Sequence, residues 1–257
     1  MESCISDIKC WMKLNYLKLN DEKTEVLLLG TRQALSKLPS ITVSVGDLQI
    51  TSDKFVKNLG SIFDAELSMD RFISTKCSSA MYYLRCISRI RKFLDSDSAK
   101  ALVHALVTSR LDYANSLLIS ANKTSIARLQ VIQNSAARLI ARTHLRDHIT
   151  PIRKQLHWLP IEHRVQYKIL VICFNCINGT APSYLCDLIK FKNTPRSLRY
   201  SDNRLLYIPP TKSKLAEKCF AVKGPQLWNT LPLSLRTCMS LNVFKKQLKT
   251  HLFTCAY

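Results

Sequence analysis

The period of the hydrophobic positions changes near residue 64. Before that point, one helical stretch and several short apolar runs alternate with turn residues; the helix covers 3–19 and the runs cover 24–29, 41–45, 48–50 and 55–63. Gly30, Gly46 and Gly60 interrupt the runs, which is typical of strands and hairpins. The pattern predicts a small α/β part in which 24–29 is a buried strand and the later runs form two hairpins.

From residue 69 onward, apolar residues recur at spacings of three and four, the period of an amphipathic helix. Helices are predicted at 69–93, from the capping run Asp95–Ser98 to Leu118, and at 125–143, 161–177, 215–228 and 243–253. Polar, basic and proline-bearing residues at 190–214 predict an extended arm. We therefore expect a mainly α fold with a small N-terminal α/β part, divided into 1–68, 69–148 and 149–257.

The charge of the chain is strongly positive, with 38 Lys and Arg against 18 Asp and Glu and a formal net charge of +20. Such a field attracts polyanions, either nucleic acid or anionic lipid. The basic residues are dispersed but also form clusters, among them Arg85, Arg89, Arg91 and Lys92, and Arg138, Arg142 and Arg146. We favour a folded groove for nucleic acid; a solvated basic surface is the plain alternative.

Membrane and secretory signals are missing from the pattern. Residues 1–10 carry Glu2 and Asp7 and no apolar core, and no apolar run reaches the roughly 20 residues of a membrane span. We therefore expect an intracellular protein, nuclear or cytoplasmic, that does not bind a membrane. Its 10 cysteines should stay reduced. Cys173 and Cys176, inside an apolar stretch, favour core packing over a zinc site.

The chemistry of a two-metal polymerase needs carboxylates placed together. The sequence holds no Asp-Asp pair, and Asp95 and Asp97 are better explained by helix capping. Its 5 glycines form neither of the common phosphate-binding loops. We therefore expect no metal and no cofactor in this chain.

Two segments near the N-terminus resemble motifs of reverse transcriptases. Leu17–Asn20 with Lys23–Glu25 resembles the motif that follows the catalytic palm strands (motif D), and Lys54–Gly60 resembles the next motif, a hairpin that supports the primer end. Further motifs follow in order: SRLDYANSLL at 109–118, LQVIQNSAARLI at 129–140, LHWLPI at 156–161, APSYL at 181–185, GPQLWNTLP at 224–232 and FKKQLKT at 244–250. The series covers nearly the whole chain and resembles the C-terminal third of LINE-type (non-LTR) retrotransposon reverse transcriptases of the jockey and chicken-repeat kind.

The resemblance implies roles for the three parts of the chain, which would be the end of the palm, a helical thumb and a basic C-terminal region. Lys23 would match the motif-D lysine that protonates the leaving pyrophosphate, and Leu59 and Gly60 would match the primer-grip hairpin. A thumb holds duplex mainly through phosphates, and the candidate contacts are Arg85, Arg89, Lys92, Arg138 and Arg142. The alternatives are a surface lysine, a bulge that needs glycine for itself, and solvated helix faces.

Essential parts of the family's polymerase have no counterpart in this sequence. The fingers and the Tyr-x-Asp-Asp turn are expected upstream of Met1, and no endonuclease domain is present. We therefore expect a fragment of RNA-directed DNA polymerase that is inactive alone, with Mg²⁺ needed only by an intact polymerase and with RNA or an RNA–DNA hybrid as partner. Two alternatives stay open: a non-enzymatic nucleic-acid-binding protein derived from such an element, and a helical scaffold for a protein partner.

Overall fold

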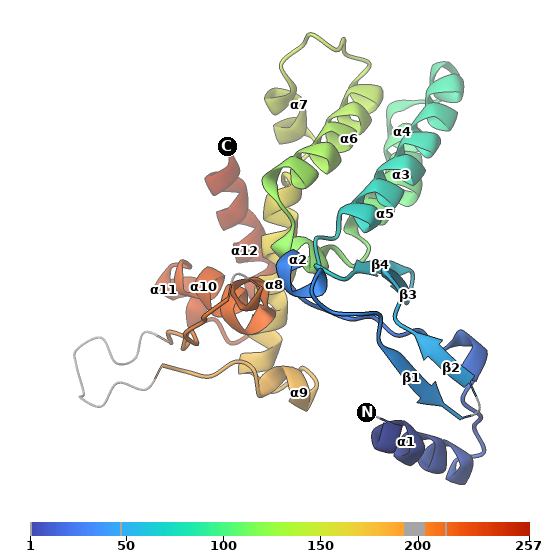
Figure 1. Ribbon diagram of the computed structural model, residues 1–257. Helices are drawn as coiled ribbons and strands as arrows, with labels where there is room; N and C mark the ends of the chain where they lie inside the picture. Colours follow the sequence, from blue (N-terminus) through green and yellow to red (C-terminus); the bar gives the residue numbers. More distant parts are fainter. Residues whose placement is uncertain (1, 47, 193–203, 214) are drawn as a thin grey trace. The chain divides into compact units, whose positions relative to one another are not determined.

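The computed structural model describes residues 2–46, 48–192, 204–213 and 215–257 (Figure 1). The chain forms two compact units, Met1–Phe72 and Ile73–Tyr257. The fold is mainly helical, and the strands of the described residues are confined to two hairpins near the N-terminus. This confirms the predicted class, mainly α with a small N-terminal α/β part.

The N-terminal unit carries three helical segments before its strands: α1 (Glu2–Leu14), the 3-10 turn η1 (Asp21–Lys23) and α2 (Arg32–Leu35). Both predicted hairpins are confirmed. One pairs β1 (Thr42–Val45) with β2 (Leu48–Thr51), and the other pairs β3 (Phe55–Asn58) with β4 (Ser61–Asp64), both antiparallel. In each pair the two strands are consecutive in the chain, so neither pair needs a crossover connection.

Two predictions for this unit are wrong. The helix expected over 3–19 ends at Leu14, because Tyr16 adopts a left-handed φ of 57° that no helix can continue through. The buried strand expected at 24–29 does not form, and only Leu27 makes a bridge, to Asp53. Leu29 is 50% exposed. A strand needs a neighbour along its whole length to pair its backbone groups, and the described residues supply one at a single position.

The C-terminal unit begins with four helical stretches in sequence. They are α3 (Asp70–Ile90) with the 3-10 turn η2 (Arg91–Phe93), α4 (Ser96–Val103) continued by the π-helical η3 (His104–Thr108) and α5 (Ser109–Asp112), the 3-10 segment η4 (Asn115–Ser120), and α6 (Lys123–Ala141). Asp95 caps α4 by accepting from the Ser98 amide at 2.7 Å, as predicted. The helix expected to run on to Leu118 breaks because Ala114 is left-handed, with a φ of 48°.

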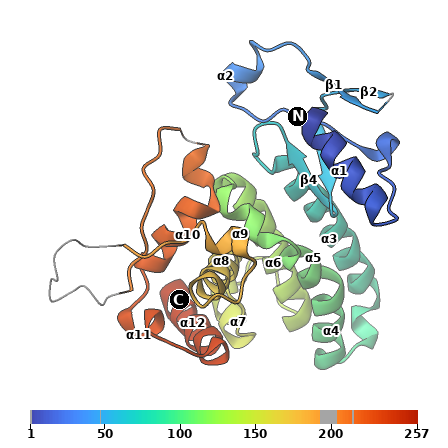
Figure 2. The same cartoon turned by 90° about the horizontal axis from the view of Figure 1, so that it is seen from below.

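The second half of this unit surrounds one central helix. Its elements are α7 (Ile149–Gln155), α8 (Ile161–Ile177), α9 (Ser183–Cys186), η5 (Ala216–Lys218), α10 (Phe220–Asn229), α11 (Leu233–Arg236) and α12 (Leu241–Ala256). Figure 2 shows α8 between α6 on one side and α10 and α12 on the other. Phe174 of α8 stacks on Phe244 of α12 with ring centroids 4.4 Å apart, and Trp228 of α10 lies 5.8 Å from the same ring. These rings form the centre of the core.

The arm predicted at 190–214 lies partly outside the described residues, at 193–203 and 214. Its described ends are not free, because Phe191 pairs with Leu206 in an antiparallel bridge. The Asn229 side chain of α10 accepts from the Leu206 amide at 2.8 Å and donates to its carbonyl at 2.9 Å. Leu206 is only 1% exposed, so this part of the predicted arm belongs to the core.

None of the helices in the described residues is both long enough and apolar enough to span a membrane.

Candidate nucleic-acid interface

A groove runs between α3 and α6 of the C-terminal unit. It consists of two hollows of about 480 and 460 Å³ that share Met81 and Arg85, and we call it the α3/α6 groove. On the α6 side, its lining residues recur every three or four positions, so they occupy one face of the helix. The basic residues that line it are Arg85, Arg91, Arg128, Arg138 and Arg142. None of its lining residues, within the described part of the chain, is acidic.

Arg91 fixes one end of the groove. Its guanidinium donates from Nε to the Leu139 carbonyl at 2.8 Å and from Nη2 to the Ile140 carbonyl at 2.7 Å. These carbonyls belong to the last turn of α6, where a helix leaves acceptors without internal partners. Desolvation lowers the pKa of the Arg91 guanidinium, and the positive charge of Arg142 adds to the effect. Arg91 therefore joins α3 to the C-terminal end of α6.

Arg142 lies at the same end of the groove. It caps α6 in a left-handed conformation with a φ of 54°, and its Nη2 donates to the carbonyls of Arg91 at 3.2 Å and Leu94 at 3.1 Å. Each of these bonds uses one Nη2 nitrogen of a guanidinium that carries five N–H donors. The side chain is exposed, so donors remain accessible to a ligand.

Arg138 and Arg128 extend the positive charge along α6. Arg138 donates to the Asp147 carbonyl at 3.2 Å, and its Nε is buried without a hydrogen-bond partner among the described residues. Arg128 donates to the Ser74 hydroxyl of α3 at 3.3 Å. A buried donor that lacks a partner carries a desolvation cost, which an anionic oxygen would offset. The groove can therefore accept phosphate oxygens.

The structure brings some of the predicted contacts together and leaves others apart. Arg85, Arg138 and Arg142 line the same groove. Arg89 and Lys92 are exposed but do not line it, and the Lys92 ammonium lies 4.8 Å from the Phe93 ring centroid. Arg91 and Arg128 were not predicted as site residues. The helical spacing of Arg128 with Arg138 and Arg142 contains the signal that would have identified it.

The remaining predicted residues belong to the N-terminal unit. Lys23 is exposed at the end of η1, where its amide donates to the Asn20 side chain at 3.2 Å. Leu59 and Gly60 form the turn between β3 and β4, with φ values of 46° and 77°. A two-residue hairpin turn with both φ values positive favours glycine for its own geometry. The geometry of the turn is therefore enough to explain why a glycine stands at position 60. The contact with a primer strand stays a prediction.

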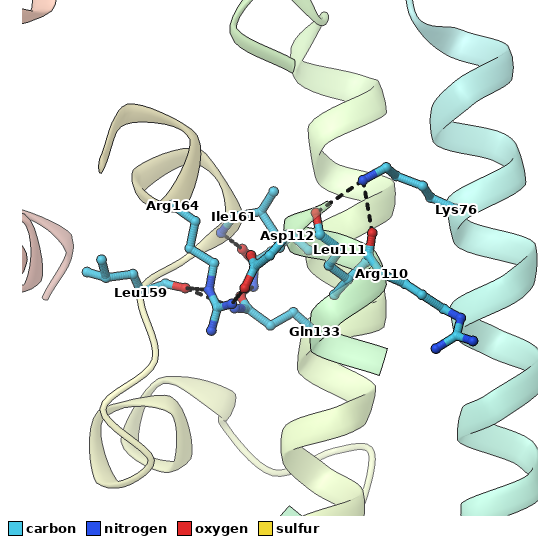
Figure 3. A network of polar contacts seen from close by, with 9 residues as sticks. Lys76, Arg110, Leu111, Asp112, Gln133, Leu159, Ile161 and Arg164 are labelled. Carbon is cyan, nitrogen blue, oxygen red and sulfur yellow. Dashed lines mark hydrogen bonds and ion pairs between the residues drawn. The ribbon is translucent and has the colours of Figure 1, made fainter. Parts of the chain in front are cut away.

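A second polar cluster joins α5, α6 and α8, which are far apart in the sequence (Figure 3). Asp112 binds Arg164 at 2.7 Å, and Arg164 also donates to the Leu159 carbonyl at 3.1 Å. Gln133 donates to the same carbonyl at 2.9 Å, and Gln130 accepts from the Ile161 amide at 2.9 Å. The motifs at 109–118, 129–140 and 156–161 therefore converge in one network.

Lys76 of α3 completes this region from the opposite side of α5. Its ammonium donates to the carbonyls of Arg110 at 2.9 Å and Leu111 at 3.5 Å (Figure 3). It also donates to the carbonyl of Tyr113. The residue is 7% exposed. Burial lowers the pKa of Lys76 to about 8, against a smaller opposing effect of Asp112. The buried cation holds the end of α5, where the chain leaves the helix.

The described residues contain no group of three or more His, Cys, Asp or Glu side chains that could hold a metal ion. Comparison of the chain with known protein families, with curated proteins and with solved structures gives no match.

Proposed function

We propose that this chain binds RNA or an RNA–DNA hybrid through the α3/α6 groove, by contacts with phosphates. The observation that carries the proposal is the convergence of Arg85, Arg128, Arg138 and Arg142 on one groove whose described lining holds no acidic residue. Guanidinium groups bind phosphate oxygens with paired, charge-assisted hydrogen bonds. Contacts of this kind position a duplex without reading its sequence.

The apolar members of the groove suit the same partner. Tyr82 is 62% exposed on α3 and Val131 is 58% exposed on α6, and both line the groove. Sugar and base faces pack against such side chains while the arginines contact the backbone. A groove with apolar walls and only positive charge is thus complementary to a nucleic-acid strand.

The motif series adds the second part of the proposal, which is the origin of the chain. We assign it to the C-terminal part of a non-LTR retrotransposon reverse transcriptase, with the end of the palm before residue 69 and the thumb in the helices that follow. Three of these motifs contribute to the network of Asp112, Gln133 and Arg164. This contact supports the assignment, because segments that pack against one another in the fold are expected to occur together in one family.

Catalysis is not part of the proposed function of this chain by itself. Its sequence has no Asp-Asp pair for the two metal ions of a polymerase. Lys23, Leu59 and Gly60 would contribute to polymerisation only together with fingers and a complete palm, which would also hold Mg²⁺. The chain therefore acts by binding, either as part of such a polymerase or as a non-enzymatic protein derived from one.

A salt titration with matched variants tests the groove. Arg85→Gln with Arg128→Gln removes two groove cations, and Arg89→Gln with Lys92→Gln removes two exposed cations that do not line the groove. Binding to a short RNA–DNA hybrid is measured by fluorescence anisotropy. For about four phosphate contacts, the wild-type affinity should fall roughly 10²-fold between about 50 and 200 mM salt.

The groove variant should bind at least about 10-fold more weakly and lower the salt slope by about 2, whereas the control should change little. Equal losses in the two variants would remove the groove from the interface. Binding that does not depend on salt, or no binding, would instead favour the helical scaffold for a protein partner.

A further inference from the structure

A separate hollow in the C-terminal unit has the composition of a ligand site. It measures about 510 Å³ and is lined by η3, the ends of α5 and η4, the segment 156–159, α8 and α12. It shares no residue with the α3/α6 groove. Its size falls in the range of pockets that hold small organic ligands.

One wall of the hollow is positively charged. Lys168 of α8 and Lys249 of α12 are exposed there, and neither makes an ion pair with a carboxylate among the described residues. The single acidic residue of the lining, Asp112, is paired with Arg164 at 2.7 Å. The pair is internally compensated, so the two lysines leave an excess of positive charge. This wall suits an anionic group.

Asn115 supplies a polar group of a different kind. The residue is 6% exposed, and its Oδ1 is buried without a hydrogen-bond partner among the described residues. Such an acceptor is costly to bury, and a ligand that places an N–H or O–H donor in the hollow would satisfy it. The left-handed Ala114 before it directs the chain from α5 into η4 and so fixes Asn115 in the lining.

Aromatic surface completes the lining. Trp158 and Tyr167 are half-buried in it, and His157 precedes Trp158 in a left-handed conformation with a φ of 53°. That conformation is uncommon outside glycine, and histidine is one of the residues that adopt it more often than most. Indole and phenol faces bind planar rings by stacking.

We propose that this hollow binds a single nucleotide. The base would stack against the aromatic side chains and donate an N–H to Asn115 Oδ1, and the phosphate would lie against Lys168 and Lys249. Asparagine pairs well with the edge of adenine, because its amide accepts from N6 and donates to N7, so an adenine nucleotide is the first ligand to test. The site is independent of the groove, and it extends the proposed function rather than depending on it.

The nucleotide has two possible sources, a free mononucleotide or the unpaired end of a bound strand. The first experiment uses the full chain and calorimetric titration with AMP, adenosine and ribose 5-phosphate. AMP should bind saturably, and the two partial ligands should each bind at least about 10-fold more weakly because each lacks one set of contacts. Absence of saturable AMP binding up to about 5 mM would overturn the proposal.

Variants separate the two sets of contacts. Asn115→Ala should weaken AMP at least about 10-fold and leave ribose 5-phosphate unchanged, without lowering the melting temperature, because the lost acceptor has no protein partner. Lys249→Gln should weaken both phosphate ligands, whereas Lys246→Gln, on the same helix but outside the lining, should weaken neither. Equal AMP affinity of wild type and Asn115→Ala would overturn the assignment of the base contact.

A competition experiment identifies the source. A hybrid with a single-stranded adenine overhang should displace AMP, and a blunt hybrid should not, if the strand end occupies the site. Displacement by neither hybrid supports a free mononucleotide. Arg85→Gln with Arg128→Gln should leave AMP binding intact, so a failure of the groove and a failure of this site give different results.

Discussion

The carboxylate of Asp112 and the guanidinium of Arg164 form an ion pair of 2.7 Å although 52 residues separate them in the chain. Arg164 also donates to the Leu159 carbonyl, which Gln133 of α6 contacts as well. The pair thus ties α5 to α8 at the point where α6 joins the network.

Breaking this pair should destabilise the C-terminal unit. Asp112→Asn leaves a partly buried guanidinium without its counter-charge and should cost about 1–3 kcal/mol in the free energy of unfolding. Arg164→Gln should cost a similar amount. The double variant should lose less than the sum, since neither charge is then left alone. Urea unfolding of the four proteins measures the coupling, and strictly additive losses would mean that the pair has no energetic role.

Gly224 of α10 should tolerate no side chain while Cys173 is present. A Cβ at this position would lie 2.8 Å from the Cys173 sulfur. Gly224→Ala should therefore cost about 1–3 kcal/mol through overpacking. Cys173→Ala removes the sulfur, and the double variant should recover part of that loss. Thermal unfolding of the single and double variants measures this. If the double variant is no more stable than Gly224→Ala, the added methyl group clashes with another neighbour, for example the Phe220 ring.

Lys76 should make stability rise with pH. Its pKa is about 8 in the folded chain and about 10.5 when unfolded. Below pH 8 the ammonium is charged in both states, and its burial cost is present in full. Between the two values the unfolded chain binds more protons, so the free energy of unfolding increases with pH, by about 3 kcal/mol in total.

The matched control for this effect is Lys76→Met, which keeps the length of the side chain and removes its titration. Unfolding free energies of both proteins are measured from pH 7.5 to 10.5. The wild type should gain stability relative to the variant across this window. A constant difference between the two would show that the ammonium keeps its proton throughout, held by the three carbonyls that accept from it.

Local stability should differ between the two units. Among the described residues up to 64, only Val43 and Val45 are buried apolar side chains, whereas Trp11, Leu14 and Leu59 are 60%, 75% and 87% exposed. Segments with few buried contacts open more readily. Hydrogen exchange should therefore be faster in β1–β4 and α1 than in α6 and α8. Equal protection of both parts would contradict the expectation.

The spacing of apolar residues predicted the helices well where the apolar face of the helix is the face that is buried. The helix expected at 161–177 has those bounds as α8, because nearly every turn of it is buried against other helices. The two hairpins followed from short apolar runs separated by glycine. The same rule failed at 24–29, where the apolar run forms a bridge at only one residue, Leu27. Whether a run finds a partner strand depends on distant parts of the chain, and the local sequence does not show it.

The candidate sites were less predictable than the fold. The basic cluster in the sequence selected Arg85 and Arg89 equally, but only Arg85 lines the groove. Residues four apart on a helix point in slightly different directions, and only the position of α6 decides which of the two side chains reaches the groove. The hollow around Asn115 draws on several elements from His104 to Lys249. Tertiary packing alone brings these together.

The bonds between α3 and α6 are unequal at the two ends of their groove, and this gives the groove a direction. At the Arg91 end, two short bonds to helix-terminal carbonyls hold the helices together. At the other end, exposed Arg128 of α6 makes a longer link, donating to the Ser74 hydroxyl of α3 at 3.3 Å. A phosphate that takes over the Arg128 guanidinium breaks that link. An anion in the groove therefore competes most readily for Arg128, whereas Arg91 stays engaged with the two carbonyls at the end of α6.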